Sequence, residues 1–162
     1  MHDTLLALSP LDGRYANSVA ALRPLFSEYG LMQARIRVEL EWLKALAVAP
    51  QIGEVAPFSA ATIAAIDQVI ADFSPEDAAA VKAIEATTNH DVKAIEYWLK
   101  NRFADNAEIA AVSEYIHFAC TSEDINNLSH ALMLQEARET VILPKLAEII
   151  EKLTGMAHDL AA

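Results

Sequence analysis

The chain has 162 residues, a formal net charge of −11 and a hydrophobic fraction of 54%, with four glycines, six prolines and one cysteine. This length suits one ordinary domain, and the apolar content suffices for a core. The few glycines and prolines leave little room for the tight turns of a many-stranded sheet, so the composition predicts an all-α fold. An acidic chain without a basic run is not expected to bind nucleic acid.

Compartment and membrane association follow from the same composition. The single thiol, Cys120, cannot form an internal disulfide, which fits a reducing compartment. The N-terminal sequence has neither a basic region nor a long apolar stretch, so we expect no secretory signal. No run of about 18 apolar residues occurs without a charge, so we expect no membrane span. The sequence therefore predicts a soluble, cytoplasmic protein.

The first predicted elements are a loop and a long helix. Residues 1–17 have no helical period and contain turn-forming residues, which predicts an ordered loop or a tail. Ser27 is a suitable N-cap for a helix whose apolar residues keep the helical period until it ends before Pro50. The charged residues of this helix are expected mostly outside its apolar stripe: Arg35, Arg37, Glu39, Glu41 and Lys44.

Shorter helices follow, and their starts are marked by local signals. Ser59 is the expected cap of the second helix. Ser74, Pro75 and Asp77 give the third helix a cap, a proline in the first turn and an acid at its third position. The third helix is expected to end at about Ala86 and the fourth to run from Val92 to about Arg102. The fifth is expected to begin near Ala107 and to carry the apolar residues Ile109, Val112 and Ile116. No strand is predicted.

The last forty or so residues, from Ser122 to Ala162, have a nearly unbroken helical period of Leu and Ile. Pro144 is expected to split this stretch into two helices or to kink one. A continuous helix would be about 60 Å long, whereas a compact domain of this size has a diameter of about 40 Å. Either the helix folds back at Pro144 or it projects to meet helices that this chain does not supply. We expect an interface there, and a chain that is a fragment of a longer protein.

Three polar segments stand near helix starts, where free N–H groups and the helix dipole attract anions. In Asp12–Tyr15, Arg14 offers a planar fork for a phosphate or a carboxylate, and a solvated turn is the alternative. In Thr87–Asp91, His90 can titrate near neutral pH, and Asp91 can orient it or cap the next helix. A plain capping turn is the alternative for this segment.

The third polar segment is Phe118–Asp124, at the start of the long C-terminal helix. Thr121 and Ser122 supply hydroxyl and amide groups that could hold a carboxylate, and an ordinary N-cap is the alternative. Next to them, Cys120 is expected to be an inert small hydrophobe.

Metal and cofactor motifs do not occur in the sequence. His117 and His130 are not spaced as a pair on one helix face, and the sequence contains no HExxH or CxxC motif. It also has no glycine-rich phosphate loop and no GxSxG elbow. We therefore expect neither a metal nor a cofactor.

Taken together, SPLDGRY (9–15), TTNHDVKAIE (87–96) and SEYIHFACTSEDINNLSHAL (113–132) closely resemble the adenylosuccinate lyases of the bacterial type, within the fumarase/aspartase superfamily. The resemblance covers the chain in order. It implies an all-helical homotetramer with active sites shared between subunits around a central bundle of long helices. Residues 1–112 would be the N-terminal helical domain, and residues 113–162 the truncated start of the central helical-bundle domain.

The resemblance also implies a reaction and its residues. These lyases eliminate fumarate from adenylosuccinate, giving AMP, and from succinyl-aminoimidazole-carboxamide ribotide in purine biosynthesis. His90 would be a supporting catalytic residue that positions and polarises the substrate. The implied substrate-binding residues are Arg14 and Tyr15 at the nucleotide phosphate, Asn89, His90 and Asp91 at the nucleotide and succinyl groups, and Thr121 with Ser122 at a succinyl carboxylate.

Two parts that the family needs are absent from this sequence. These are the ThrHisGly segment with the general-acid histidine and the mobile serine-containing loop with the base. We therefore expect this chain alone to be inactive. The alternatives are another fumarate-releasing lyase of the superfamily, which would share the Thr-Ser helix start, and a non-catalytic helical module whose C-terminal stripe binds a partner.

Overall fold

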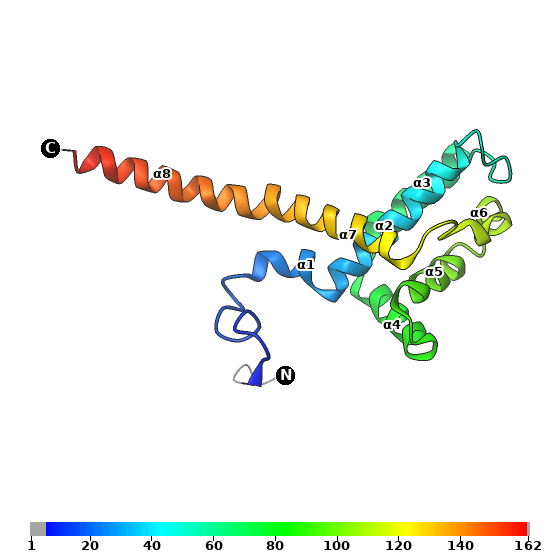
Figure 1. The fold of residues 1–162 in the computed structure, drawn as a ribbon, viewed down its shortest axis with the longest axis horizontal. Coiled ribbons are helices and arrows are strands. Elements are labelled where there is room, and N and C mark those ends of the chain that lie inside the picture. Colours follow the sequence, from blue (N-terminus) through cyan, green and yellow to red (C-terminus); the bar gives the residue numbers. More distant parts are fainter. Residues whose placement is uncertain (1–5, 162) are drawn as a thin grey trace. The chain divides into compact units, whose positions relative to one another are not determined.

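The computed structural model describes residues 6–161, and these residues form helices and turns without a strand (Figure 1). The prediction of an all-α fold is confirmed. The α-helices are α1 (Arg23–Phe26), α2 (Glu28–Ala47), α3 (Ala60–Asp72), α4 (Pro75–Thr88), α5 (Asp91–Arg102), α6 (Ala107–Ala111), α7 (Ser122–Ala137) and α8 (Leu143–Asp159). The chain divides into two compact units: Leu31–Ala131, and the described parts of Met1–Gly30 and Leu132–Ala162.

The predicted helix starts are confirmed by their capping hydrogen bonds. Ser27 Oγ accepts the Gly30 N–H at 3.3 Å, and the Ser59 side chain accepts the Thr62 N–H at 3.2 Å. Ser74 and Asp77 form a complete capping box at the start of α4. Because each cap satisfies N–H groups that the helix itself leaves free, these boundaries depend on local chemistry.

Helix α2 is the central helix of the unit Leu31–Ala131, and it is buried on more sides than its apolar stripe predicts. Arg35 and Glu39, expected outside the stripe, are 6% and 0% exposed. The expectation was wrong for these two residues because each meets a polar partner far along the chain: Asp91 and Asn126 for Arg35, and His117 for Glu39. The fully buried core around α2 is Ile36, Leu40, Leu43, Ile66, Val81, Val92, Ile95, Leu99, Ile109 and Ile125. Helices α4 and α5 pack against each other beside it as a hairpin (Figure 1).

The fifth predicted helix is shorter than expected. Helix α6 ends at Ala111, and a 3-10 turn, Ser113–Tyr115, follows it. Beyond that turn, His117 and Ala119 have φ angles of 65° and 58°. A left-handed residue cannot continue a right-handed helix, so the chain turns here although Ile116 is still buried.

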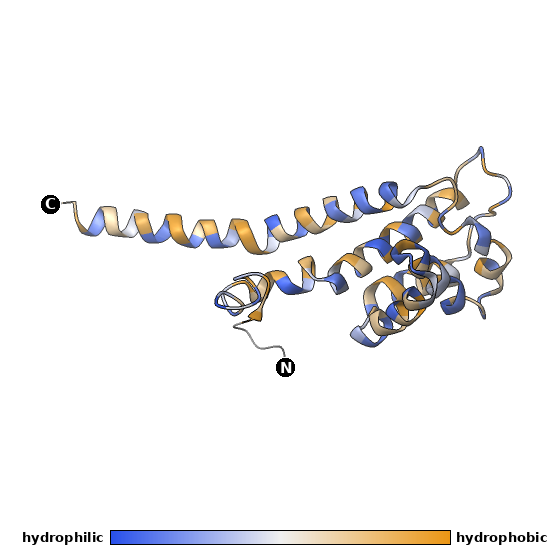
Figure 2. Ribbon diagram, turned by 60° about the horizontal axis from the view of Figure 1, so that its bottom comes forward, coloured by the Kyte–Doolittle hydropathy of each residue, from blue (hydrophilic) through white to orange (hydrophobic). Residues whose placement is uncertain are grey.

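The C-terminal helical stretch does not fold back at Pro144. Helix α7, a π-helical turn (Arg138–Ile142) and α8 follow one another without a gap. Pro144 lies in the first turn of α8, where the wider π turn precedes it and its missing N–H is tolerated. All residues from Ile142 to Ala161 are exposed, and hydrophobic positions recur along α8 (Figure 2). Among residues 6–161, none of the helices combines the length and the hydrophobicity that a membrane span needs.

Candidate functional site

The turn between α4 and α5 contains three predicted site residues. Asn89 ends α4 in the left-handed conformation, with φ 50°. His90 is the N-cap of α5, and its Nδ1 accepts the Lys93 N–H at 3.2 Å. Because Nδ1 is an acceptor, a neutral His90 ring carries its proton on Nε2. The capping interpretation of this turn is therefore correct for His90, and Nε2 remains available for a ligand.

Asp91, the next residue, is held by an ion pair to α2. Its Oδ2 lies 2.7 Å from Nη2 of Arg35, and its Oδ1 accepts the Val92 N–H at 2.9 Å. Burial opposes ionisation of Asp91, but the Val92 N–H and the Arg35 guanidinium outweigh it and lower the pKa of this carboxyl. Asp91 is therefore ionised near neutral pH and anchors the turn that carries His90.

Arg35 joins two of the predicted polar segments. Besides its contact with Asp91, its Nε donates to Asn126 Oδ1 at 2.9 Å, and Asn126 lies one turn into α7. The start of α5 and the start of α7, distant in sequence, are thus tied to the same buried guanidinium. Sequence reasoning missed Arg35 because the helical period shows which face of α2 a charged residue lies on but not which partner it meets there.

At the start of α7, the two predicted hydroxyls have different environments. Thr121 forms a capping box with Asp124: Asp124 Oδ2 accepts the Thr121 N–H at 2.7 Å and the Thr121 hydroxyl at 2.8 Å. The Asp124 N–H donates back to Thr121 Oγ1 at 3.4 Å. The half-buried Ser122 hydroxyl has no hydrogen bond within residues 6–161. The Thr121 side chain is therefore engaged in the cap, whereas the Ser122 side chain is free for a ligand.

The loop before Thr121 is anchored to α2 by two further side chains. Glu39 Oε1 lies 2.6 Å from His117 Nδ1, and Trp42 Nε1 donates to the Phe118 carbonyl at 2.9 Å. Arg35, Glu39 and Trp42 follow one another at i, i+4 and i+7, so they share one face of α2. Sequence reasoning did not assign His117 to the site; the helical spacing of the three α2 residues was the available signal.

The left-handed conformation of Ala119 gives a prediction for stability. Replacing Ala119 by glycine removes the Cβ and with it a strain of about 1–2 kcal/mol. The greater conformational freedom of glycine in the unfolded chain offsets about 0.5–1 kcal/mol of this stabilisation. Ala119→Gly is therefore expected to leave the free energy of unfolding unchanged or to raise it. As a control, Ala83→Gly on the exposed side of α4 is expected to lower it by about 1 kcal/mol. Urea unfolding of both variants measures the difference, and equal losses would contradict the assignment of strain.

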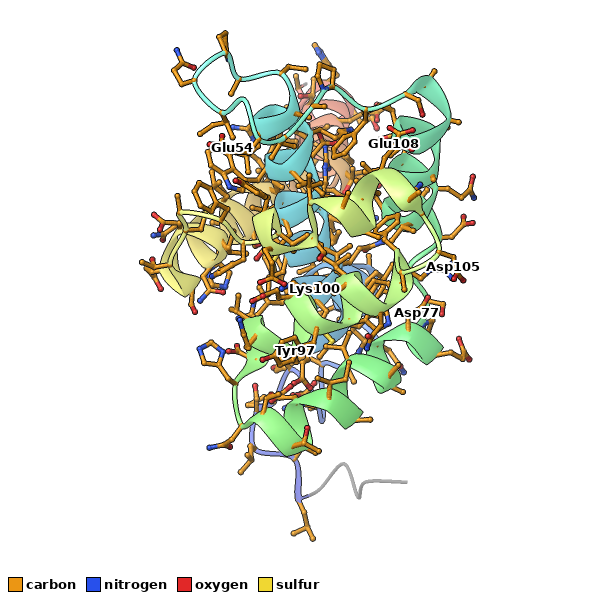
Figure 3. All side chains as sticks on the ribbon, turned by 90° about the vertical axis from the view of Figure 1, so that its right-hand side faces the viewer. Glu54, Asp77, Tyr97, Lys100, Asp105 and Glu108 are labelled. Carbon is orange, nitrogen blue, oxygen red and sulfur yellow. The ribbon has the colours of Figure 1, made fainter. Side chains whose placement is uncertain are left out.

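Lys93, next to this turn, is less available to a ligand than its charge suggests. Its Nζ lies 2.7 Å from Glu96 Oε2, and it stacks 5.1 Å above the ring of Tyr97. Glu96 also binds Lys100, and Figure 3 shows Tyr97 and Lys100 on α5. These contacts hold α5 together, so Lys93 is already partly neutralised.

Cys120 and the described carboxylates offer no reactive thiol or metal centre. Burial, together with the charges of Glu39 and Asp124, raises the pKa of the Cys120 thiol. A thiol in this environment stays protonated near neutral pH and is a poor nucleophile. Within residues 6–161, no group of three or more His, Cys, Asp and Glu side chains could hold a metal ion.

Arg14 and Tyr15 belong to the other compact unit, in the turn-rich segment before α1. The Arg14 guanidinium carbon lies 5.5 Å from the centre of the Tyr15 ring, and Tyr15 is exposed. Neighbouring Asp12 pairs with Arg23 at 3.3 Å, so Arg14 is the cation of this turn that keeps its guanidinium in solvent. Both side chains are accessible to an anionic ligand.

The chain matches known proteins over nearly its whole length. A family model described as Lyase matches residues 13–161. The adenylosuccinate lyase of Haemophilus influenzae is 56% identical over 156 residues, covering 96% of this chain and 34% of the relative. That of Escherichia coli K12 is 56% identical over 154 residues, and that of Legionella pneumophila (strain Corby) 45% over 156 residues, with 95% of this chain and 34% of each relative covered. The chain thus spans about a third of the length of these curated relatives.

Proposed function

The chain belongs to the lyase family, and from this premise we propose that it forms the N-terminal third of an adenylosuccinate lyase. The reaction is the elimination of fumarate from adenylosuccinate and from succinyl-aminoimidazole-carboxamide ribotide, in purine biosynthesis and without a cofactor. Residues 1–112 form the N-terminal domain and residues 113–162 the start of the central bundle. The assembly is a cytoplasmic homotetramer. Its other helices cover the apolar residues of α8, which are exposed in this chain.

The observation that carries the proposal is the convergence on Arg35 of the turn that contains His90 and the helix that starts at Ser122. Elimination removes a proton next to a carboxylate and builds up a dianion, which needs donors aimed at it. The Ser122 hydroxyl and the free amides at the start of α7 can donate to the succinyl carboxylate. The Nε2–H of a neutral His90 can donate to the substrate and polarise it.

The other residues complete the binding roles. Arg14 and Tyr15 bind the nucleotide phosphate, and Asn89 and Asp91 line the nucleotide and succinyl groups. Thr121 caps α7 next to the succinyl carboxylate. The net charge of −11 opposes an anionic substrate. Further cations, the general acid and the base are therefore supplied by the remainder of the longer protein, and this chain alone does not turn over substrate.

The test is a chimera in which this chain replaces the matching N-terminal third of the Escherichia coli lyase, to which it is 56% identical over 154 residues. The chimera is expected to release fumarate from adenylosuccinate, while the chain alone releases no more than its own Arg14→Ala variant. A folded, tetrameric chimera without activity would contradict the proposal. Activity of the chain alone would contradict the need for the remainder.

A second candidate, a non-catalytic helical interaction module, is favoured by one observation. The residues of α8 are exposed and include a run of large apolar side chains: Leu143, Leu146, Ile149, Ile150, Leu153 and Met156. The chimera separates the two candidates, because an interaction module does not support fumarate release in place of a lyase segment. Another fumarate-releasing lyase of the superfamily is separated by comparing adenylosuccinate with argininosuccinate as substrates.

A further inference from the structure

A buried carboxylate on α2 has no role in the mechanism described so far. Glu39 is 0% exposed, and its Oε1 lies 2.6 Å from Nδ1 of His117. Its other oxygen, Oε2, is buried without a hydrogen-bond partner within residues 6–161. A buried glutamate with a hydrogen bond to only one of its two oxygens lowers the stability of the fold, and an apolar side chain of similar size would often stabilise the fold at least as well. Stability alone is therefore a poor explanation for this residue.

The contact fixes the orientation of His117, and an ionised Glu39 also selects its tautomer. An ionised carboxylate accepts a proton, so it favours the ring with hydrogen on Nδ1 and leaves Nε2 as the remaining nitrogen. Within residues 6–161, Nε2 has no hydrogen-bond partner, and the side chain is 19% exposed. The ring therefore keeps one nitrogen for a ligand.

The backbone around His117 points to the same site. His117 and Ala119 hold left-handed conformations between two anchors, the Trp42 bond to the Phe118 carbonyl and the Thr121 cap. Strained backbone that its surroundings enforce is typical of functional segments. The loop leads directly into Ser122, whose hydroxyl is free. We propose that Glu39 is a positioning residue of the lyase site, holding His117 so that its Nε2 faces the substrate; this inference rests on the proposed function.

The other groups around Glu39 do not replace this role. Burial raises the pKa of Glu39; the hydrogen bond from His117 only partly offsets this effect, and the charge of Glu96 adds a smaller increase. Glu96 itself is paired with Lys93 and Lys100. Among the described residues, His117 is thus the group that is hydrogen-bonded to the Glu39 carboxylate, and it is expected to respond to the removal of Glu39.

The first part of the test is spectroscopic and uses this chain itself. In long-range proton–nitrogen correlation NMR spectra of the chain with nitrogen-labelled histidine, neutral His117 is expected to carry its proton on Nδ1. Glu39→Leu removes the acceptor and is expected to abolish this preference, whereas Glu39→Gln keeps an acceptor oxygen and is expected to retain it. An Nε2–H tautomer in the unsubstituted chain would overturn the inference. Circular dichroism checks that each variant is folded.

The second part measures kcat/KM in the chimera. Glu39→Leu is expected to lower kcat/KM by about tenfold or more. The same substitution is expected to have no further effect when His117 is already alanine. Glu39→Gln is expected to retain most of kcat/KM. Glu41→Gln, an exposed glutamate on the same helix that pairs with Lys44, is the control and is expected to leave kcat/KM unchanged.

Each outcome identifies what has failed. An unsubstituted chimera without activity contradicts the proposed function. An active chimera in which Glu39→Leu keeps full kcat/KM, or loses as much again in the His117→Ala background, overturns only the positioning role. If Glu39→Leu does not fold, Glu39→Gln decides: a loss as large as that of His117→Ala overturns the inference, and a smaller loss with the Nδ1–H tautomer retained supports it.

Discussion

Replacing Ser122 by alanine in the chimera is expected to lower kcat/KM by about 10²- to 10³-fold, the usual cost of removing one donor from a site where negative charge develops. The free energy of unfolding is expected to change by less than about 0.5 kcal/mol. The reason is that the Ser122 hydroxyl has no partner within residues 6–161, so its removal leaves no buried group unsatisfied. Steady-state kinetics and urea unfolding give the two numbers.

Thr121 supplies the matched comparison at the adjacent position. Its hydroxyl and N–H are bound to Asp124 in the capping box. Thr121→Ala is therefore expected to lower the free energy of unfolding by about 1 kcal/mol, and Thr121→Ser, which keeps the hydroxyl, to restore it. A large stability loss in Ser122→Ala, or none in Thr121→Ala, would show that the roles of the two hydroxyls are exchanged.

Replacing Arg35 by leucine is expected to lower the free energy of unfolding by about 2 kcal/mol. The guanidinium is buried and binds Asn126 and Asp91, but the Asp91 side chain is 52% exposed, so water recovers part of the loss. In the chimera the same change is expected to lower activity, because the turn that carries His90 is released from α7. Arg37→Leu, an exposed arginine on the same helix, is the control and is expected to change stability by less than about 0.5 kcal/mol.

The pH dependence of this difference has a definite sign. The pKa of Asp91 is lowered in the folded chain, so its ionisation stabilises the fold above the ordinary carboxyl pKa of about 3.9. That stabilisation is lost as the pH falls through the lowered value. The gap between the unsubstituted chain and Arg35→Leu is therefore expected to shrink below about pH 4. A gap that stays constant from neutral to acid pH would contradict the ion pair.

Some features of the fold were predictable because they depend on neighbouring residues alone. The caps at Ser27, Ser59 and Ser74 need only a side-chain oxygen and an N–H group three residues later. The helical period of apolar residues likewise predicts the all-α fold. The end of α6 at Ala111 was not predictable, because nothing in the side chain of Val112 indicates that its backbone leaves the helical conformation, with φ −121° and ψ 23°.

For the site, the sequence by itself determined which residue types stand at the helix starts, and hence the candidates His90, Thr121 and Ser122. Only the tertiary structure decided how they act. It buries Arg35 and Glu39 against Asp91 and His117, and it engages Thr121 in a cap while leaving Ser122 free. The helical period of the apolar residues shows which side of a helix is apolar. Whether a charged residue finds a partner there depends on contacts between segments far apart in the chain, and those contacts exist only in the folded protein.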